Sequence, residues 1–504
     1  MTSAWDANPR EIPRIRRLRG GGDSEPTAQA RTQAGPRVSR VQVIEHVPHR
    51  EEGFPLGRTG LDIDGLFAIA LLAPMLFVGQ LGQLGVAMVA GLVPLYLFLR
   101  REGLGKLFLP RSFLFMVPAF ALFSVVWTTA PGETLRYAIE LTITVIAGLL
   151  LSSARNQEAV VRGISLAFLS YVVASIFFGG YVGVGVGMGG EAFSGLSESK
   201  NLLADIASTG LVASAVVALL AIQNRRWLWI AIAAASIAMD LYCAVAARSA
   251  GAILGLGMAT LAIAGLTPLV YAGKVVRAAV TSMVGICLVM TGIFYSTIAQ
   301  AMIDLGANIF DKDPTLTGRT YLWYRAADLI REKPMFGRGF YAFWLQGNID
   351  AEGLWRYFGI DGRGGFTFHN TFVEILVMLG WTGMVVIGLT LATGVIFLIR
   401  RFVTRPTLTQ VFWMGILLYE LARTPIETVG VAPFYFSTAL VFGALGAAFK
   451  RSRSRKRERE EAAEAQQAWR NGFAGDGWAA ARPQPVSLRL VKTAPLTGSS
   501  ESGR

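Results

Sequence analysis

Cysteine, histidine and charged residues are all scarce in this chain of 504 residues. The only two cysteines, Cys243 and Cys287, both fall inside apolar runs, so a disulfide framework and a thiolate metal cluster are excluded. Charged side chains make up 16% of the residues and hydrophobic ones 53%, a balance that is too apolar for an ordinary soluble enzyme of this length. The excess apolar surface must therefore face lipid.

Apolar runs long enough to cross a bilayer recur from residue 66 to residue 449, with short polar breaks between them. They predict an all-α polytopic membrane protein with about 12 transmembrane helices. The expected spans are 65–80, 83–99, 113–128, 138–152, 161–179, 203–222, 227–246, 250–272, 277–297, 371–399, 408–422 and 430–449. Outside this transmembrane domain, 65–449, lie an N-terminal arm, 1–64, and a tail, 450–504, that is basic and then of low complexity.

The net charge of +13 is concentrated at the two ends of the chain and in alternate loops. The loop residues that carry it are Arg100, Arg101, Lys106, Arg111, Arg155, Arg162, Arg225, Arg226, Lys274, Arg277, Arg400, Arg401 and Arg405. This alternation is an orientation signal, not a nucleic-acid surface, because lysine and arginine accumulate in cytoplasmic loops. It predicts an inner-membrane protein with both termini in the cytoplasm. The arm lacks the apolar segment of a signal peptide and is expected to be a disordered cytoplasmic extension.

The same orientation predicts four segments on the outer, periplasmic face: 179–201, a tight hairpin at Arg248, a large loop at about 297–369, and a turn at Arg423. Arginine in a short outer loop opposes the orientation bias. Two interpretations stay open for Arg248 and Arg423. Each side chain could reach the lipid head groups, or the arginines could form an anion site.

Part of the large loop has the periodicity of an amphipathic helix. Trp323, Ala326, Ala327 and Ile330 recur at the spacing of one helical face, which predicts a helix that begins near Arg319 and stops before Pro334. Its apolar stripe is expected to rest on the membrane domain. The glycine-rich segments 337–339 and 362–365 are expected to be turns.

Histidine occurs three times, and only one copy is expected near the outer face. His46 and His49 belong to the arm, whereas His369 lies where the large loop enters the next span. An imidazole can accept a proton near neutral pH, which suits a general base that activates a hydroxyl. The alternative is a residue that caps the start of a helix. No metal site or cofactor is expected, because no second histidine or thiol is available on that face.

Four arginines are expected on the same face as His369: Arg248, Arg319, Arg338 and Arg423. Guanidinium groups match phosphate oxygens with two parallel hydrogen bonds and stay charged, so these residues suit a negatively charged, lipid-anchored substrate. Alternatively, Arg319 and Arg338 form ordinary salt bridges with acids of the loop, namely Asp311, Asp313 or Glu332. The acids Asp240, Glu374 and Glu420 could balance the arginines or, in a transporter, carry protons.

Three segments of the expected outer face form a set of motifs: Gly195-Leu196-Ser197-Glu198-Ser199-Lys200-Asn201; Gly318-Arg319-Thr320-Tyr321-Leu322-Trp323 with Glu332-Lys333-Pro334-Met335-Phe336-Gly337-Arg338-Gly339; and His369-Asn370-Thr371-Phe372. Together they resemble the O-antigen ligase and polysaccharide polymerase superfamily. Arg248-Ser249 is also similar to an inverted form of that family's Ser-Arg hairpin. The resemblance covers residues 195–400 and includes the order of the motifs and the large outer loop.

The resemblance implies metal-independent, inverting glycosyl transfer from an undecaprenyl-diphosphate-linked oligosaccharide, and makes 65–449 a catalytic domain. His369 matches the position proposed as the base, and Arg248, Arg319, Arg338 and Arg423 would hold the diphosphate. Lys200, Asn201 and Asn370 would be positioning residues.

Polymerases and ligases of this superfamily differ in their acceptor. The basic arm and the form Thr317-Gly318-Arg319-Thr320 resemble the exopolysaccharide polymerases, so polymerisation of lipid-linked repeats into exopolysaccharide or an O-antigen-like polymer is the first expectation. The alternatives are a ligase that transfers polymer to lipid A core and, in another class, a transporter of polysaccharide or lipid-linked sugar. The arm and the tail are candidates for contacting a co-polymerase that controls chain length.

Overall fold

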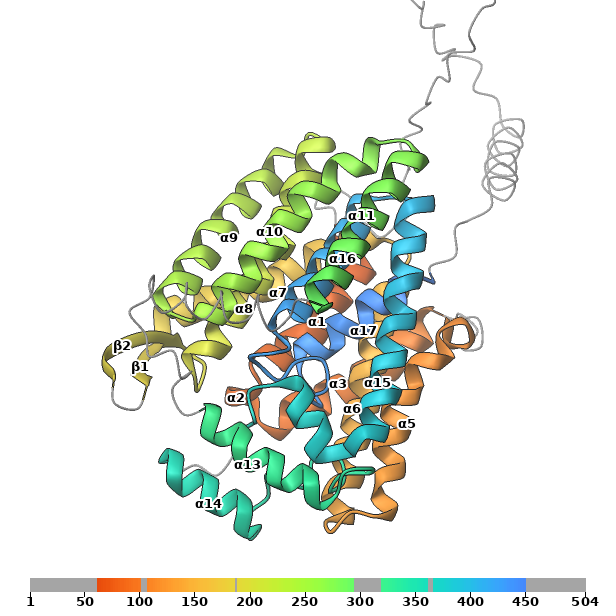
Figure 1. Ribbon diagram of the computed structural model, residues 1–504. Helices are drawn as coiled ribbons and strands as arrows, with labels where there is room; N and C mark the ends of the chain where they lie inside the picture. Colours follow the sequence, from red (N-terminus) through yellow and green to blue (C-terminus); the bar gives the residue numbers. More distant parts are fainter. Residues whose placement is uncertain (1–60, 101–106, 186–187, 294–318, 361–365, 450–504) are drawn as a thin grey trace, which may run out of the picture. The chain divides into compact units, whose positions relative to one another are not determined.

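The structure is a computed structural model that describes residues 61–100, 107–185, 188–293, 319–360 and 366–449 (Figure 1). All of these belong to one compact unit, Gly53–Arg504, whereas a second unit, Met1–Glu52, lies outside the described residues. The expected arm, apart from 61–64, and the expected tail also lie outside them. The same holds for Asp311 and Asp313 and for the turn expected at 362–365.

The described chain is almost entirely helical. Its first part contains α1 (Ile63–Leu76), α2 (Val78–Leu81), α3 (Gln83–Arg100), η1 (Leu109–Phe115), α5 (Met116–Phe123), η2 (Ser124–Val126), α6 (Pro131–Ser153) and α7 (Gln157–Phe178). A short antiparallel hairpin follows, β1 (Gly180–Gly185) and β2 (Met188–Gly195). The remaining helices are α8 (Lys200–Gln223), α9 (Trp227–Ala246), α10 (Ala250–Tyr271), α11 (Lys274–Ile293), α13 (Arg319–Glu332), α14 (Ile349–Phe358), α15 (Thr371–Thr404), α16 (Leu408–Arg423) and α17 (Phe436–Ala447).

Seven helical segments of the described residues are long and apolar enough to cross a membrane, judged by length and composition. They are Leu109–Val126, α6, α7, α8, α9, α10 and α15, and α1, Gln83–Leu99 and α17 are shorter apolar helices. Large apolar side chains on α10, α11 and α15 are exposed, among them Leu261, Val275 and Leu389. Such surface is stable only against lipid, so the chain is an all-α polytopic membrane protein. Each of the twelve expected spans overlaps a described helix.

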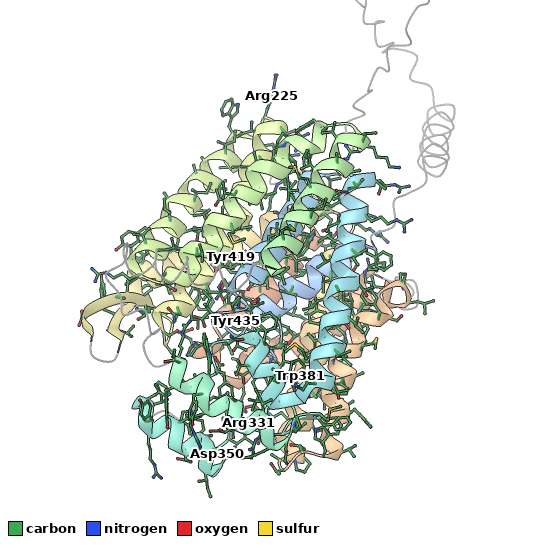
Figure 2. All side chains as sticks on the ribbon, in the orientation of Figure 1. Arg225, Arg331, Asp350, Trp381, Tyr419 and Tyr435 are labelled. Carbon is green, nitrogen blue, oxygen red and sulfur yellow. The ribbon has the colours of Figure 1, made fainter. Side chains whose placement is uncertain are left out.

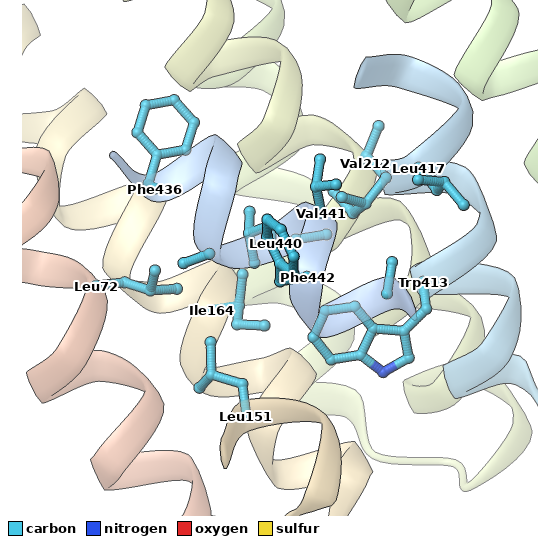
Figure 3. Close-up of a cluster of buried hydrophobic side chains, with 14 of the residues drawn as sticks. Leu72, Leu151, Ile164, Val212, Trp413, Leu417, Phe436, Leu440, Val441 and Phe442 are labelled. Carbon is cyan, nitrogen blue, oxygen red and sulfur yellow. The ribbon is translucent and has the colours of Figure 1, made fainter. Parts of the chain in front are cut away.

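The core forms where α17 packs against α1, α6, α15 and α16 (Figures 1 and 3). Phe436, Leu440 and Phe442 of α17 are buried together with Leu72 of α1 and Trp413 of α16 (Figure 3). The Trp413 indole donates to the Gln157 amide oxygen at 2.9 Å, which satisfies its only donor inside the apolar cluster. This packing fixes the positions of α16 and α17 and of the connection between them.

Helix α15 is broken at Gly380, whose φ of +64° and ψ of −166° are not helical. The segment 334–339 fills the break. The N–H groups of Trp381 and Thr382 donate to Pro334 and Met335, and Arg338 and Gly339 donate to carbonyl groups of α15. A Cβ on Gly337 would lie 2.5 Å from the Met378 carbonyl carbon, so only glycine allows this approach. The Gly-x-Gly of the sequence motif therefore inserts into a transmembrane helix.

Helix α13 begins at Arg319 and ends at Glu332, as the periodicity predicts. The expected apolar stripe was wrong by about one position, because Leu322, Ala326 and Leu329 are the buried residues, and Trp323 and Ile330 are only partly buried. The buried face of α13 is set by its packing partners, which lie in α14 and at residues 343, 368 and 377. Because a helical side chain leans toward the N-terminal turn, the residues that reach these partners differ from those that the spacing alone suggests. The stripe therefore packs on other loop residues as well as on α15.

Candidate functional site

The backbone around His369 is fixed by hydrogen bonds of its neighbours in the sequence. The Phe368 N–H donates to Glu374 at 2.8 Å, and the Trp323 indole donates to the Phe368 carbonyl oxygen at 2.8 Å. The His369 N–H donates to the Thr367 hydroxyl at 3.1 Å, and the His369 φ is +49°, a left-handed value that is uncommon outside glycine. The imidazole is therefore presented from a fixed backbone.

Asn370, not His369, caps α15. Its side-chain oxygen accepts the N–H groups of Phe372 and Val373 at 3.0 and 3.2 Å, as an N-cap residue does. Its amide group also donates to the Pro425 carbonyl oxygen at 3.0 Å. Asn370 thus joins the start of α15 to the segment that follows α16, and the imidazole of His369 is left for another role.

Glu427 is the side chain on which the site converges. One carboxylate oxygen, Oε2, lies 3.1 Å from His369 Nδ1, and the other, Oε1, lies 3.0 Å from a terminal nitrogen of Arg319. The Asn201 amide group makes a longer contact of 3.5 Å with Oε1. A single carboxylate therefore brings together residues from α8, α13 and the start of α15.

The turn after α16 positions this carboxylate. The N–H groups of Ile426 and Glu427 both donate to the Arg423 carbonyl oxygen, which extends the helix by one turn. Thr371 fastens the turn to α15, since its N–H donates to the Thr424 carbonyl oxygen and its hydroxyl to the Glu427 carbonyl oxygen at 2.8 Å. Arg319 donates in addition to the Ile426 carbonyl oxygen at 2.6 Å.

This geometry fixes which imidazole nitrogen can act as a base. Burial alone would raise the pKa of Glu427, but the hydrogen bond and charge of His369 and the charges of Arg319 and Arg423 lower it to about 2. Glu427 is therefore ionised at neutral pH and can only accept hydrogen bonds. In a neutral imidazole, Nδ1–H is the group that donates to this carboxylate, which leaves Nε2 as the nitrogen that can accept a proton. The side chain of His369 is 28% exposed, so a substrate hydroxyl can reach it.

Arg423 points away from this cluster into the protein. Its guanidinium is paired with Asp205 of α8 and with Glu420, and it is 5% exposed. Asp205 also accepts the hydroxyls of Tyr419 at 3.0 Å and Tyr435 at 2.9 Å. Figure 2 labels both tyrosines in the middle of the described unit. Glu420 thus balances Arg423, as the sequence allowed, whereas the carboxylate of Glu374 binds no arginine among the described residues and holds Phe368, Trp344 and Thr428.

The remaining predicted site residues lie at different distances from the cluster. Arg338 is ion-paired with Glu332, the loop salt bridge left open by the sequence, and lies 4.0 Å from Asp350. Arg248 is exposed between α9 and α10 and forms no ion pair within the described part of the chain. A Cβ on Gly251, three residues on, would lie 2.6 Å from Ile426, so this hairpin borders the Glu427 turn. Lys200 begins α8, next to Asn201.

Glu427 and Asp205 are two residues of this site that were not predicted from the sequence. A signal for Glu427 was present, since it is the only acidic residue between Arg423 and Phe436, four residues after an arginine that was itself singled out. Asp205 lies inside an apolar run, and the sequence alone does not show which distant residue pairs with its charge.

Two comparisons with known proteins bear on these residues. A family model described as O-antigen ligase matches residues 235–388, a range that contains Arg248, Arg319, Arg338 and His369 but not Glu427. The exopolysaccharide production protein ExoQ of Rhizobium meliloti (strain 1021) is 29% identical over 395 residues, which cover 76% of this chain and 88% of that protein. Together the two matches confirm that the chain resembles the O-antigen ligase and Wzy-type polysaccharide polymerase superfamily.

Proposed function

We propose that this protein is a membrane glycosyltransferase that polymerises undecaprenyl-diphosphate-linked oligosaccharide repeats at the periplasmic face of the inner membrane. The family match and the relative support an enzyme of polymerase or ligase type in polysaccharide biosynthesis. The observation that carries the proposal is the shared carboxylate. Glu427 contacts the imidazole of His369, the proposed base, and the guanidinium of Arg319, the proposed phosphate ligand, although these two residues are 50 positions apart along the chain.

In the proposed reaction, His369 Nε2 removes the proton from an acceptor sugar hydroxyl. The oxygen attacks the anomeric carbon of the donor sugar, and the bond from that carbon to the diphosphate oxygen breaks. The electron pair leaves with the polyprenyl diphosphate, whose developing charge Arg319 stabilises through the N–H groups that Glu427 and Ile426 do not use. Attack from the face opposite the leaving group inverts the anomeric carbon, and no step needs a metal ion or a cofactor.

The other arginines have graded roles in this proposal. Exposed Arg248, beside the Glu427 turn, contributes positive charge to the diphosphate. Arg338 can do so if it exchanges Glu332 for the substrate, while Arg423 acts on the diphosphate only through the field that remains after Asp205 and Glu420 are counted. Lys200, Asn201 and Asn370 position the turn and the substrate.

The proposed orientation is supported by contacts between loops. Side chains that link connections expected in the cytoplasm include Asn156 with Asp62, Arg111 with Gly446 and Arg277 with Val403. The contacts that link expected outer segments include Gln80 with Leu196, Trp127 with Phe336 and Asn370 with Pro425. Figure 2 shows Arg225 at one end of the unit and Arg331 and Asp350 at the other. We propose twelve crossings, with both termini in the cytoplasm and the site outside.

The alternatives differ in what they require. The relative's name concerns exopolysaccharide production, which favours polymerisation over transfer to lipid A core. A transporter often carries broken helices whose free backbone groups bind the cargo. Here the break in α15 is filled by residues 334–339, whose backbone satisfies it, so it offers no such site. The arm and tail are proposed to contact a chain-length co-polymerase.

The test is chain growth by purified protein in nanodiscs supplied with a lipid-diphosphate oligosaccharide. We expect longer lipid-linked products from the native chain and none from His369→Ala, at equal abundance, because loss of a general base slows a reaction by about 10² to 10⁴. Polymer of normal length from His369→Ala would remove the base assignment. Product attached to lipid A core instead of to a second repeat would establish the ligase alternative.

A further inference from the structure

A groove runs between α1 and α3, and none of its lining residues belongs to the cluster around Glu427. It has a volume of about 550 Å³, within the range of ligand pockets. Its lining is Ala70, Ala73, Pro74, Phe77, Gln80 and Leu81 on the α1–α2 side and Ala87, Met88, Gly91, Leu92 and Leu95 on α3. Apart from the Gln80 side chain, the lining side chains are apolar.

The groove exists because α1 and α3 touch at both of its ends and carry small residues between these contacts. At one end α3 meets α1 closely, since a Cβ on Gly85 would lie 3.1 Å from the Pro74 carbonyl oxygen. At the other end the rings of Phe67 and Tyr96 stack with centroids 3.6 Å apart. Between these contacts alanine and glycine face the gap, and a Cβ on Gly91 would meet no atom within 4 Å. The gap is thus held open by contacts above and below it.

A hydrogen bond links Gln80, one of the lining residues, to the segment that leads into the candidate site. The Gln80 amide group donates to the Leu196 carbonyl oxygen at 2.8 Å. Leu196 lies in the short segment that leads to Lys200 and Asn201, and the Asn201 side chain contacts Glu427. A ligand with a long apolar tail and an anionic head could therefore place its tail between α1 and α3 and its head near Lys200 and Arg319.

We propose that the groove between α1 and α3 binds the proximal isoprene units of the polyprenyl diphosphate that carries the donor sugar. This inference rests on the proposed function and deepens it, because it assigns the lipid half of the substrate. A flexible apolar chain suits a narrow, almost wholly apolar groove, and burying it there anchors the diphosphate. The competing occupant is an acyl chain of an ordinary phospholipid.

The first test uses the His369→Ala protein in nanodiscs, so that no turnover intervenes, and a polyprenyl diphosphate with a photoactivatable diazirine near the head of its tail. We expect crosslinks on α1 and α3, competed by unlabelled undecaprenyl diphosphate but not by the same amount of phosphatidylglycerol. Equal competition by phosphatidylglycerol, or crosslinks confined to other helices, would overturn the assignment.

The second test fills the groove. Gly91→Leu places a side chain in the open space, and we expect its Kd for the same polyprenyl diphosphate to rise at least about tenfold. Gly265→Leu is the matched control, because Gly265 of α10 is also exposed with no atom within 4 Å of its Cβ position. An unchanged Kd in Gly91→Leu, or an equal rise in Gly265→Leu, contradicts the proposal.

The outcomes separate the two proposals. Binding of the probe away from α1 and α3, with chain growth that still depends on His369, removes the groove and leaves the glycosyl transfer. No binding of polyprenyl diphosphate to the native protein removes both. Should Gly91→Leu fail to insert, photolabelling of the unaltered groove decides the matter alone.

Discussion

At the scale of single residues, the site depends on a histidine in an uncommon backbone conformation. A non-glycine residue with φ near +50° costs about 1 to 3 kcal/mol and persists only where its surroundings fix it. For His369 these surroundings are Thr367, Glu374 and Trp323. The scarcity of histidine predicted His369 from the sequence. Glu427 could not be predicted in the same way, because its partners lie 58 and 108 residues away and only the tertiary fold selects it.

Glu427→Gln is expected to change which nitrogen of the His369 imidazole carries the proton. With the carboxylate present Nδ1 carries the proton, whereas an amide can donate to Nδ1 and so favour protonation at Nε2, which removes the base. Nitrogen NMR of histidine-labelled protein measures this directly, because the chain has only three histidines and two of them belong to the arm. Chain growth should fall together with the tautomer change.

Glu332→Gln is the matched control for this measurement. It removes one carboxylate from the exposed Arg338 pair and leaves the His369 contact in place, so the His369 signals should not move. Identical His369 signals in native protein and in Glu427→Gln would mean that Glu427 holds the turn without setting the proton position.

Arg319→Lys is expected to lower kcat/KM for the lipid-linked donor by about 100-fold although the positive charge is retained. Arginine uses its planar fork to bind Glu427 and Ile426 at once and still has N–H groups left for a diphosphate, and an ammonium group cannot reproduce that arrangement. Arg325→Lys, on the same helix and paired with Asp328 at the surface, should retain native kinetics. Wild-type turnover with lysine at 319 would reduce Arg319 to loop packing.

At the scale of elements, the sequence predicts where helices run better than where they break. Apolar length located the helices, seven of which are long and apolar enough to cross a membrane within the described residues, and the periodicity from Arg319 to Glu332 located α13. The break at Gly380 was not predictable in this way, because glycine inside an apolar run is compatible with a continuous transmembrane helix. Only the docking of residues 334–339 explains it, since their backbone supplies the hydrogen bonds that α15 loses there.

Gly337→Ala is expected to destabilise the protein by about 2 kcal/mol or more, because it adds a Cβ at a φ of +66° and against the backbone of α15. Thermal unfolding in detergent should show a lower Tm. Gly388→Ala is the control within α15, where a Cβ would meet no atom within 4 Å, and its Tm should equal or slightly exceed that of the native protein. Equal Tm values for the two variants would argue against a tightly inserted segment.

At the scale of the whole molecule, the contacts group the connections between helices into the same two sets that the charge pattern predicts. The charge pattern uses only lysine and arginine in loops. The contacts are made by other groups as well, such as Asn156 with Asp62 on one side and Asn370 with Pro425 on the other. The sequence predicts a side for each loop, but it could not show which loops of one side touch, because that depends on how the helices pack.

Sidedness is tested by cysteine labelling in intact spheroplasts. Both native cysteines would first be replaced by alanine, and single cysteines introduced at two exposed positions, Arg225→Cys and Arg331→Cys. A membrane-impermeant maleimide is expected to label Arg331→Cys at once and Arg225→Cys only after permeabilisation, because the two positions lie at opposite ends of the unit (Figure 2). The reverse pattern would place His369 and Glu427 in the cytoplasm. A periplasmic glycosyl transfer could not then be maintained, whatever the kinetics of the variants.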